Sequence, residues 1–284
     1  MWPHRESSRF VDAGGVCWHV QVMGEASAPA VLLLHGTGAA THSWRGLAPL
    51  LAEHFHVIAP DLPGHGFTSA PPEGDHSLPS FSALIAKLLS ALAVKPMLIM
   101  GHSAGAAIAA RMSLDGLAEP ESIVSINGAL LPLQGLPGQI FSPLAKLLAA
   151  NSLVPRLFSW RAGDPAVTER LLRGTGSKID DETKAFYGEL MRHSSHASAA
   201  LKMMAHWDLA ALQRDLPRLK TPLHLIVGNN DRTVPASEAD RVKAFLPKTS
   251  ITRLPGLGHL AHEEAPEAVF STIETVLNSL KVAA

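Results

Sequence analysis

The sequence predicts an α/β fold, in which a mostly parallel, twisted sheet is flanked by helices and interrupted by a helical insertion. Two observations carry this prediction. In the first half of the chain, short apolar runs alternate with longer segments rich in Ala and Leu, which is typical of a parallel sheet covered on both faces. After residue 128 the alternation stops, and strand-like runs return only at residue 223. We therefore expect a core in two parts (residues 1–128 and 217–284) and a helical cap or lid (residues 129–216).

The expected elements follow in chain order. Two strands, at residues 9–12 and 16–23, flank Gly14-Gly15 and should pair as a β-hairpin. Further strands are expected at residues 30–34, 57–59, 97–100, 122–126, 223–227 and 250–254. Helices are expected near residues 42–53, 80–93, 104–114, 236–245 and 266–280.

The composition limits the classes of function. Of the 284 residues, 46% are apolar and 17% are charged, which supports a sizeable buried core and argues against disorder. The 24 basic and 25 acidic residues nearly cancel, so no excess charge directs the chain to nucleic acid. The single cysteine suits a reducing compartment, and no apolar run is long enough for a transmembrane segment. We expect a cytoplasmic protein, with peripheral attachment to a membrane left open.

The sequence Gly101-His102-Ser103-Ala104-Gly105 follows the pattern G-x-S-x-G and joins an expected strand to an expected helix. By chance alone the pattern arises in about one chain in ten of this length. The strand–turn–helix context makes it specific, because such a tight turn lifts a serine hydroxyl clear of the sheet. Ser103 is therefore predicted to be a nucleophile, and the alternative is an ordinary helix-capping serine.

A serine nucleophile needs a general base, and the base needs an acid that orients it. His259 follows the last expected strand, and Asp231 follows the strand before it. The chain order Ser103, Asp231, His259 is the one that accompanies a nucleophile elbow of this kind. Agreement across three separate loops is more specific than any single motif, so these residues are the predicted catalytic triad.

The sequence His35-Gly36-Thr37-Gly38 follows the strand at residues 30–34. Glycines at this point let backbone N–H groups approach a substrate oxygen. The predicted oxyanion hole consists of the amides of Thr37 and Ala104. The Leu, Met and Trp content of the cap indicates an apolar pocket, for which the candidate residues are His35, His102, Met204 and Trp207.

Other motifs have weaker functional interpretations. His262 competes with His259 as the base, but Glu263-Glu264 beside it indicates a solvated helix start. The pair His193-x-x-His196 has helical spacing for two zinc ligands but no convincing third ligand, so neither a metal nor a cofactor is expected. The stretch Asp61-Leu62-Pro63-Gly64-His65-Gly66 is interpreted as a turn held by the aspartate side chain rather than as an ion loop.

Taken together, these motifs resemble the α/β-hydrolase superfamily over nearly the whole chain. Serine rather than aspartate in the elbow separates the chain from the dehalogenase and epoxide-hydrolase branches. More specific stretches resemble the BchO family, the magnesium-chelatase accessory proteins of bacteriochlorophyll biosynthesis in phototrophic bacteria. They are residues 35–45, 127–132, 141–146 and 203–209. The resemblance implies a role linked to the insertion of magnesium into protoporphyrin IX, and it supplies no chemical substrate.

Two function hypotheses follow. In the first, the chain is a serine hydrolase that acts on a small hydrophobic ester or acyl substrate, for which a porphyrin or porphyrin ester is a candidate. In the second, it is a non-catalytic accessory or porphyrin-binding protein that serves magnesium-chelatase subunits on a hydrolase scaffold. An unrelated carboxylesterase is a third interpretation, disfavoured by the matches in the cap. The resemblance also places the protein at photosynthetic membranes if it attaches to a membrane at all.

Overall fold

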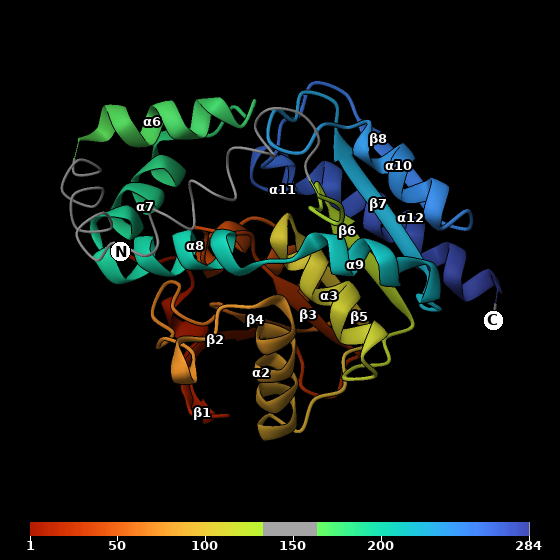
Figure 1. Cartoon of the computed structure of the whole chain (residues 1–284), viewed down its shortest axis with the longest axis horizontal. Helices are drawn as coiled ribbons and strands as arrows, with labels where there is room; N and C mark the ends of the chain where they lie inside the picture. Colours follow the sequence, from red (N-terminus) through yellow and green to blue (C-terminus); the bar gives the residue numbers. More distant parts are fainter. Residues whose placement is uncertain (133–163, 284) are drawn as a thin grey trace.

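The computed structural model describes residues 1–132 and 164–283 of the chain. In this part of the chain eight strands form one sheet, in the spatial order β1-β2-β4-β3-β5-β6-β7-β8. Their bounds are β1 Ser8–Ala13, β2 Val16–Met23, β3 Ala30–Leu34, β4 His56–Pro60, β5 Leu98–His102, β6 Ser122–Ile126, β7 Leu223–Gly228 and β8 Ser250–Leu254. The hairpin β1–β2 and the pair β2–β4 are antiparallel, and every other pair is parallel. The predicted mostly parallel sheet is confirmed (Figure 1).

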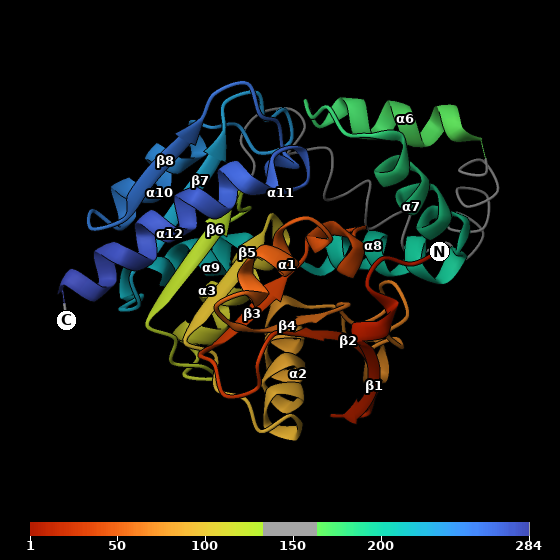
Figure 2. The same cartoon turned by 180° about the vertical axis from the view of Figure 1, so that it is seen from behind.

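Alternate residues of the buried strands face two separate apolar cores. In β3, for example, Leu32 and Leu34 belong to one core, whereas Val31 and Leu33 belong to the other. The first core is covered by α2 (Leu78–Ala91), α3 (Ala104–Leu114) and α10 (Glu238–Phe245). The second is covered by α1 (Leu47–Ala52) and α12 (Pro266–Ala283), which Figure 2 shows on the opposite face of the sheet. Both faces of the sheet are therefore covered by apolar side chains. Polar residues that could form a site are expected at the ends of the strands.

The described part of the expected cap is helical. It contains α6 (Pro165–Gly174), α7 (Asp181–Arg192), α8 (Ser194–His206) and α9 (Leu209–Asp215), followed by a 3-10 turn at Leu216–Arg218. Residues 133–163, which include the matched stretch 141–146, lie outside the described residues. In Figure 1 α6, α7 and α8 lie beside one end of the sheet, above the hairpin strands. The cap boundaries at residues 129 and 216 stay predictions.

The expected helix at residues 42–53 was wrong in detail. The segment forms a 3-10 turn at Thr41–Trp44, and α1 begins only at Leu47. Pro49 has no N–H to donate to the carbonyl group of Arg45, so a continuous helix through this point would lack a hydrogen bond. Proline is tolerated in the first turn of a helix, which is where α1 places it. Among the described residues, no helix has the length and apolar content that a membrane crossing requires.

Candidate active site

Ser103 lies in the sharp turn between β5 and α3. Its φ of 50° and ψ of −114° fall in a region that residues other than glycine rarely adopt. The Ser103 N–H donates to the carbonyl oxygen of Ile126 (3.1 Å), which ties the turn to β6. A Cβ atom on Gly101 would overlap the backbone of Gly105, and one on Gly105 would overlap the carbonyl oxygen of Leu34. The turn therefore requires these glycines, and it leaves the Ser103 side chain half-buried.

Asp231 and His259 meet at the carboxyl ends of β7 and β8. His259 Nδ1 lies 2.7 Å from Asp231 Oδ2, and both side chains are buried. Asp231 Oδ2 also accepts from the side-chain amide of Asn127 (2.8 Å), while Oδ1 accepts from the backbone N–H groups of Thr233 (2.7 Å) and Val234 (2.8 Å). Because an ionised carboxylate only accepts hydrogen bonds, Nδ1 of His259 is the donor in this contact, and Nε2 is the ring nitrogen that does not contact Asp231. The predicted roles of His259 and Asp231 require this contact, and the roles themselves stay a prediction.

Asn127 had no predicted role. It follows β6 at the same sheet edge, between the elbow strand β5 and the acid strand β7, and its side chain is buried. An asparagine cannot supply a negative charge, but its amide can donate to one. The signal that could have revealed it was its position one residue beyond the carboxyl end of a central parallel strand.

His102 links the elbow to the base loop. Its Nε2 donates to the carbonyl oxygen of His259 (2.9 Å), and the two ring centroids are 4.8 Å apart. Burial, reinforced by the nearby rings of His262 and His259, holds the pKa of His102 well below its usual value, so the ring is neutral. No hydrogen bond joins Ser103 Oγ to His259 Nε2 in the described part of the chain. Such contacts are often long in hydrolases without bound substrate.

The loop after β3 passes directly beside the elbow. A Cβ atom on Gly36 would lie 3.1 Å from Cβ of Ser103, so the loop backbone lies close to the elbow. His35 supports the loop: its Nδ1 donates to the carbonyl oxygen of Gly36 (2.8 Å), and its Nε2 accepts from the N–H of Leu62 (2.8 Å). Both ring nitrogens are used and the ring is fully buried, so His35 supports the backbone rather than facing a ligand. Thr37 and Ala104 as oxyanion donors stay a prediction.

The other pocket candidates are not brought together. Met204 is an exposed side chain, whereas its neighbour Met203 is fully buried and its sulfur accepts from Thr37 Oγ1 (3.5 Å). Trp207 donates from Nε1 to the carbonyl oxygen of His76 (3.0 Å), which ties the cap to the start of α2. A cavity of about 890 Å³ lies between α6, α7 and the N-terminal residues, and its described lining includes none of the predicted site residues.

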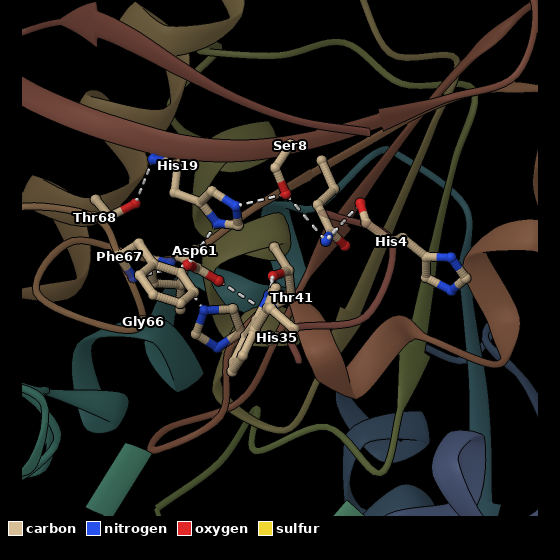
Figure 3. A network of polar contacts seen from close by, with 12 residues as sticks. His4, Ser8, His19, His35, Thr41, Asp61, Gly66, Phe67 and Thr68 are labelled. Atoms are coloured by element: carbon tan, nitrogen blue, oxygen red, sulfur yellow. Dashed lines mark hydrogen bonds and ion pairs between the residues drawn. The ribbon is translucent and has the colours of Figure 1, made fainter. Parts of the chain in front are cut away.

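A second Ser–His–Asp arrangement exists elsewhere in the molecule (Figure 3). Ser8 Oγ lies 2.9 Å from His19 Nε2, and His19 Nδ1 lies 2.8 Å from Asp61 Oδ2. Asp61 also accepts from the N–H groups of Thr41 (2.6 Å) and Phe67 (2.9 Å). Burial would raise the pKa of Asp61, but the hydrogen bond and charge of His19 outweigh it and the pKa is lowered. The prediction of a turn held by Asp61 is confirmed.

Position separates this network from the site at Ser103. Ser8 lies on β1, the edge strand, with extended backbone angles (φ −80°, ψ 136°). It therefore has neither the strained turn nor the following helix N-terminus that present a nucleophile and its oxyanion donors. The network ties β1 and β2 to the loops at residues 36–44 and 61–69, which is a structural role.

The expectation of a solvated helix start at residues 262–264 was wrong. His262 is fully buried and only 3% of the Glu263 side chain is exposed. Glu263 Oε1 accepts from Ser43 Oγ (2.5 Å) and from the hydroxyl group of Tyr187 on α7 (2.7 Å). Burial raises the pKa of Glu263 to about 7, although both hydrogen bonds oppose the shift. The cap helix α7 covers this position, which sequence pattern alone does not reveal.

The chain has 15 histidines, which are common metal ligands. Of the pair with helical spacing, for which no metal was expected, His196 is buried, with Nε2 bonded to the carbonyl oxygen of Gly38 (3.1 Å) and Nδ1 accepting from the N–H of Gly66 (3.0 Å). His193 is instead an exposed side chain beside Glu189. Within residues 1–132 and 164–283, no group of three potential ligand side chains is arranged to hold a metal ion.

Comparisons with known proteins show the family and the fold. The sequence model described as "Alpha/beta hydrolase family" matches residues 31–272. The magnesium-chelatase 30 kDa subunit of Rhodobacter capsulatus is 38% identical over 272 residues, which cover 96% of this chain and 95% of that protein. The resemblance stated from the motifs is thereby confirmed.

Solved structures agree on the fold. An α/β-hydrolase-fold protein from Burkholderia ambifaria superposes with a TM-score of 0.78 at 23% identity, covering 93% of this chain and 96% of that one. A thermophilic esterase from Thermogutta terrifontis gives a TM-score of 0.76 at 20% identity, covering 96% and 99%. Because the family model matches most of its length, the chain belongs to the α/β-hydrolase family.

Proposed function

We propose that this chain is a serine hydrolase that cleaves an ester or related acyl bond, with Ser103 as nucleophile, His259 as base and Asp231 as orienting acid. One observation supports it above the others. A serine in a strained elbow shares a sheet edge with a histidine whose Nδ1 is bonded to a fully hydrogen-bonded carboxylate. A purely structural serine has no need of such strain.

In the proposed reaction, Ser103 Oγ bonds to the carbonyl carbon while His259 Nε2 takes the hydroxyl proton. The carbonyl electron pair moves to oxygen, and the amides of Thr37 and Ala104 donate to this oxyanion. Collapse of the intermediate expels the alcohol, which receives the proton from His259. Water then attacks the acyl group in the same way, releasing the acid and restoring Ser103. Asp231 stays ionised and stabilises the imidazolium.

The surroundings of the elbow favour an apolar substrate. Ala104 belongs to the same buried apolar cluster as Leu130, Leu131 and Met203, and Met203 reaches the loop that carries Thr37. A charged acyl group would lose its hydration there without gaining an ion partner. Small hydrophobic esters fit this chemistry, and a porphyrin ester belongs to the same class.

Hydrolysis of p-nitrophenyl esters of increasing acyl length tests the proposal. The folded protein should release p-nitrophenol with a burst equal to the enzyme concentration if deacylation is slow. Ser103→Ala should abolish turnover, whereas Ser8→Ala, which removes the hydroxyl group of the other Ser–His–Asp arrangement, should keep it. Equal activity of wild type and Ser103→Ala would overturn the proposal.

A second candidate rests on the relative from Rhodobacter capsulatus, which is similar over nearly its whole length. In this alternative the chain serves magnesium chelatase by contact with its subunits or by holding a porphyrin, and turnover is not its task. Complementation separates the two candidates. In a phototroph that lacks the endogenous protein, Ser103→Ala should fail to restore pigment if catalysis is required and should restore it fully if binding is enough.

A further inference from the structure

The connection between α6 and α7 runs directly over the loops that carry Asp231 and His259. We call residues 175–178, from Thr175 to Lys178, the bridge. The bridge belongs to the helical cap in sequence and continues from the last turn of α6, but it also makes hydrogen bonds with the core. The carbonyl oxygen of Thr175 accepts from the N–H of Arg232 (3.1 Å) and from the N–H of His259 itself (3.3 Å). One oxygen atom thus joins the acid loop to the base loop.

Ser177 and Glu264 make further contacts with the loop that carries His259. Ser177 Oγ accepts from the N–H of Leu260 (2.8 Å), the residue after the base. The carboxylate of Glu264 spans both segments, because Oε1 accepts from the N–H of Gly258 (2.7 Å) and Oε2 from the N–H of Lys178 (2.9 Å). Three consecutive backbone amides, at residues 258–260, therefore donate to the bridge or to Glu264 bound to it.

The backbone of the bridge lies in direct contact with the backbones of the loops that carry Asp231 and His259. A Cβ atom on Gly258 would overlap the backbone of Gly176 and Ser177, and one on Gly176 would overlap the carbonyl oxygen of Asn230. Gly176 also has a φ of +83°, which disfavours any larger residue. Both glycines are therefore needed for the bridge to lie against the two loops.

We propose that the bridge is a positioning element of the active site, in which Ser177 and Glu264 hold the backbone of His259 in register with Asp231. The inference rests on the proposed function, because it assigns these residues an effect on the base. The imidazole contacts Asp231 through one hydrogen bond, so its direction depends on where the loop backbone lies. Small errors in the position of a catalytic group cost rate steeply. The end of the cap next to α7 is thus part of the catalytic support rather than a movable cover.

The test compares Ser177→Ala with a control at the same connection. Ser177→Ala removes the acceptor for the Leu260 amide. Asp180→Ala removes the N-cap of α7 and a partner of Arg45, which loosens the cap without touching the loops of the site. With a p-nitrophenyl ester, Ser177→Ala should lower kcat about tenfold or more and change KM less than twofold. Ser177→Thr, which keeps a hydroxyl group, should recover most of kcat. Asp180→Ala should stay within twofold of wild type.

A spectroscopic readout separates positioning from general loosening. The downfield proton resonance of the His259–Asp231 hydrogen bond should broaden or shift in Ser177→Ala and not in Asp180→Ala, with thermal unfolding of both variants recorded. Equal losses of kcat in the two variants, or a loss confined to KM, would overturn the proposal.

The proposal about the bridge can be tested even if the proposed hydrolase function is wrong. If the wild type has no hydrolase activity, amide hydrogen exchange at Leu260 and His259 still reports on it. Faster exchange in Ser177→Ala alone supports the bridge as a support of the base loop. Unchanged exchange in Ser177→Ala overturns it.

Discussion

The side-chain amide of Asn127 donates a 2.8 Å hydrogen bond to Asp231 Oδ2, the same oxygen that receives Nδ1–H of His259. Three neighbouring strand ends, those of β6, β7 and β8, thereby meet at one carboxylate. A hydrogen bond to a charged group keeps that charge in place, so Asn127 should matter for catalysis although it does not touch the substrate.

Replacement of Asn127 by Ala should therefore lower kcat about tenfold, equivalent to about 1.4 kcal/mol of transition-state stabilisation, and leave KM nearly unchanged. Asn229→Ala, in the exposed part of the Asp231 loop, is the matched control and should behave as wild type. Steady-state kinetics on a p-nitrophenyl ester measures both. An unchanged kcat for Asn127→Ala would show that the hydrogen bond from Asn127 to Asp231 does not contribute to catalysis.

The backbone strain at Ser103 should lower the free energy of unfolding of the wild type. Glycine adopts a φ of +50° without penalty, so Ser103→Gly should raise the free energy of unfolding by about 1 kcal/mol while abolishing hydrolysis. Ser103→Ala keeps a Cβ atom and should lose activity without this gain. Urea denaturation of the three proteins compares them. If Ser103→Gly were less stable than Ser103→Ala, the claim that the backbone at Ser103 is strained would be contradicted.

Glu263 should make stability depend on pH. Its pKa is about 7 in the folded protein and near 4.5 without burial, so the folded state holds a proton that the unfolded state has lost between these values. The free energy of unfolding should therefore fall as pH rises from 4.5 to 7, by about 3 kcal/mol in total. Glu263→Gln cannot titrate but still accepts from Ser43 or Tyr187, and its stability profile should be flat by comparison. Denaturation at several pH values tests this, and parallel profiles for the two proteins would refute it.

The network of Ser8, His19 and Asp61 should affect stability alone. Ser8→Ala removes one partner of the buried His19 ring and should lower the free energy of unfolding by about 1 kcal/mol. Its kcat should stay within twofold of wild type, because the edge strand lies away from the elbow. Loss of turnover in a folded Ser8→Ala protein would assign chemistry to this network.

Local sequence patterns were enough to predict the sheet and the elbow. The run at residues 30–34 is apolar on both faces, as a strand in a sheet covered on two sides requires. This strand and the one at residues 122–126 were predicted with the bounds that the structure has. The nearness of Asp231 to His259 could be predicted as well, because parallel strands deliver the residues that follow them to one edge.

Contacts made by the cap could not be predicted in this way. Glu263 looks like a surface residue in the sequence, but it is buried against Ser43 and the hydroxyl group of Tyr187, both of which are distant along the chain. The same holds for Thr175, whose backbone oxygen, with no side-chain signal, joins two loops of the site. Backbone contacts between distant segments leave no trace in residue type, apart from the glycines that permit them.

The central claim, that Ser103 is an activated nucleophile, is tested most directly by a fluorophosphonate probe and the intact mass of the folded protein. The wild type should gain one adduct, located on the peptide that contains Ser103. Ser8→Ala should gain the same adduct, and Ser103→Ala should gain none. A folded wild type that stays unlabelled, or an adduct that persists in Ser103→Ala, would contradict the account.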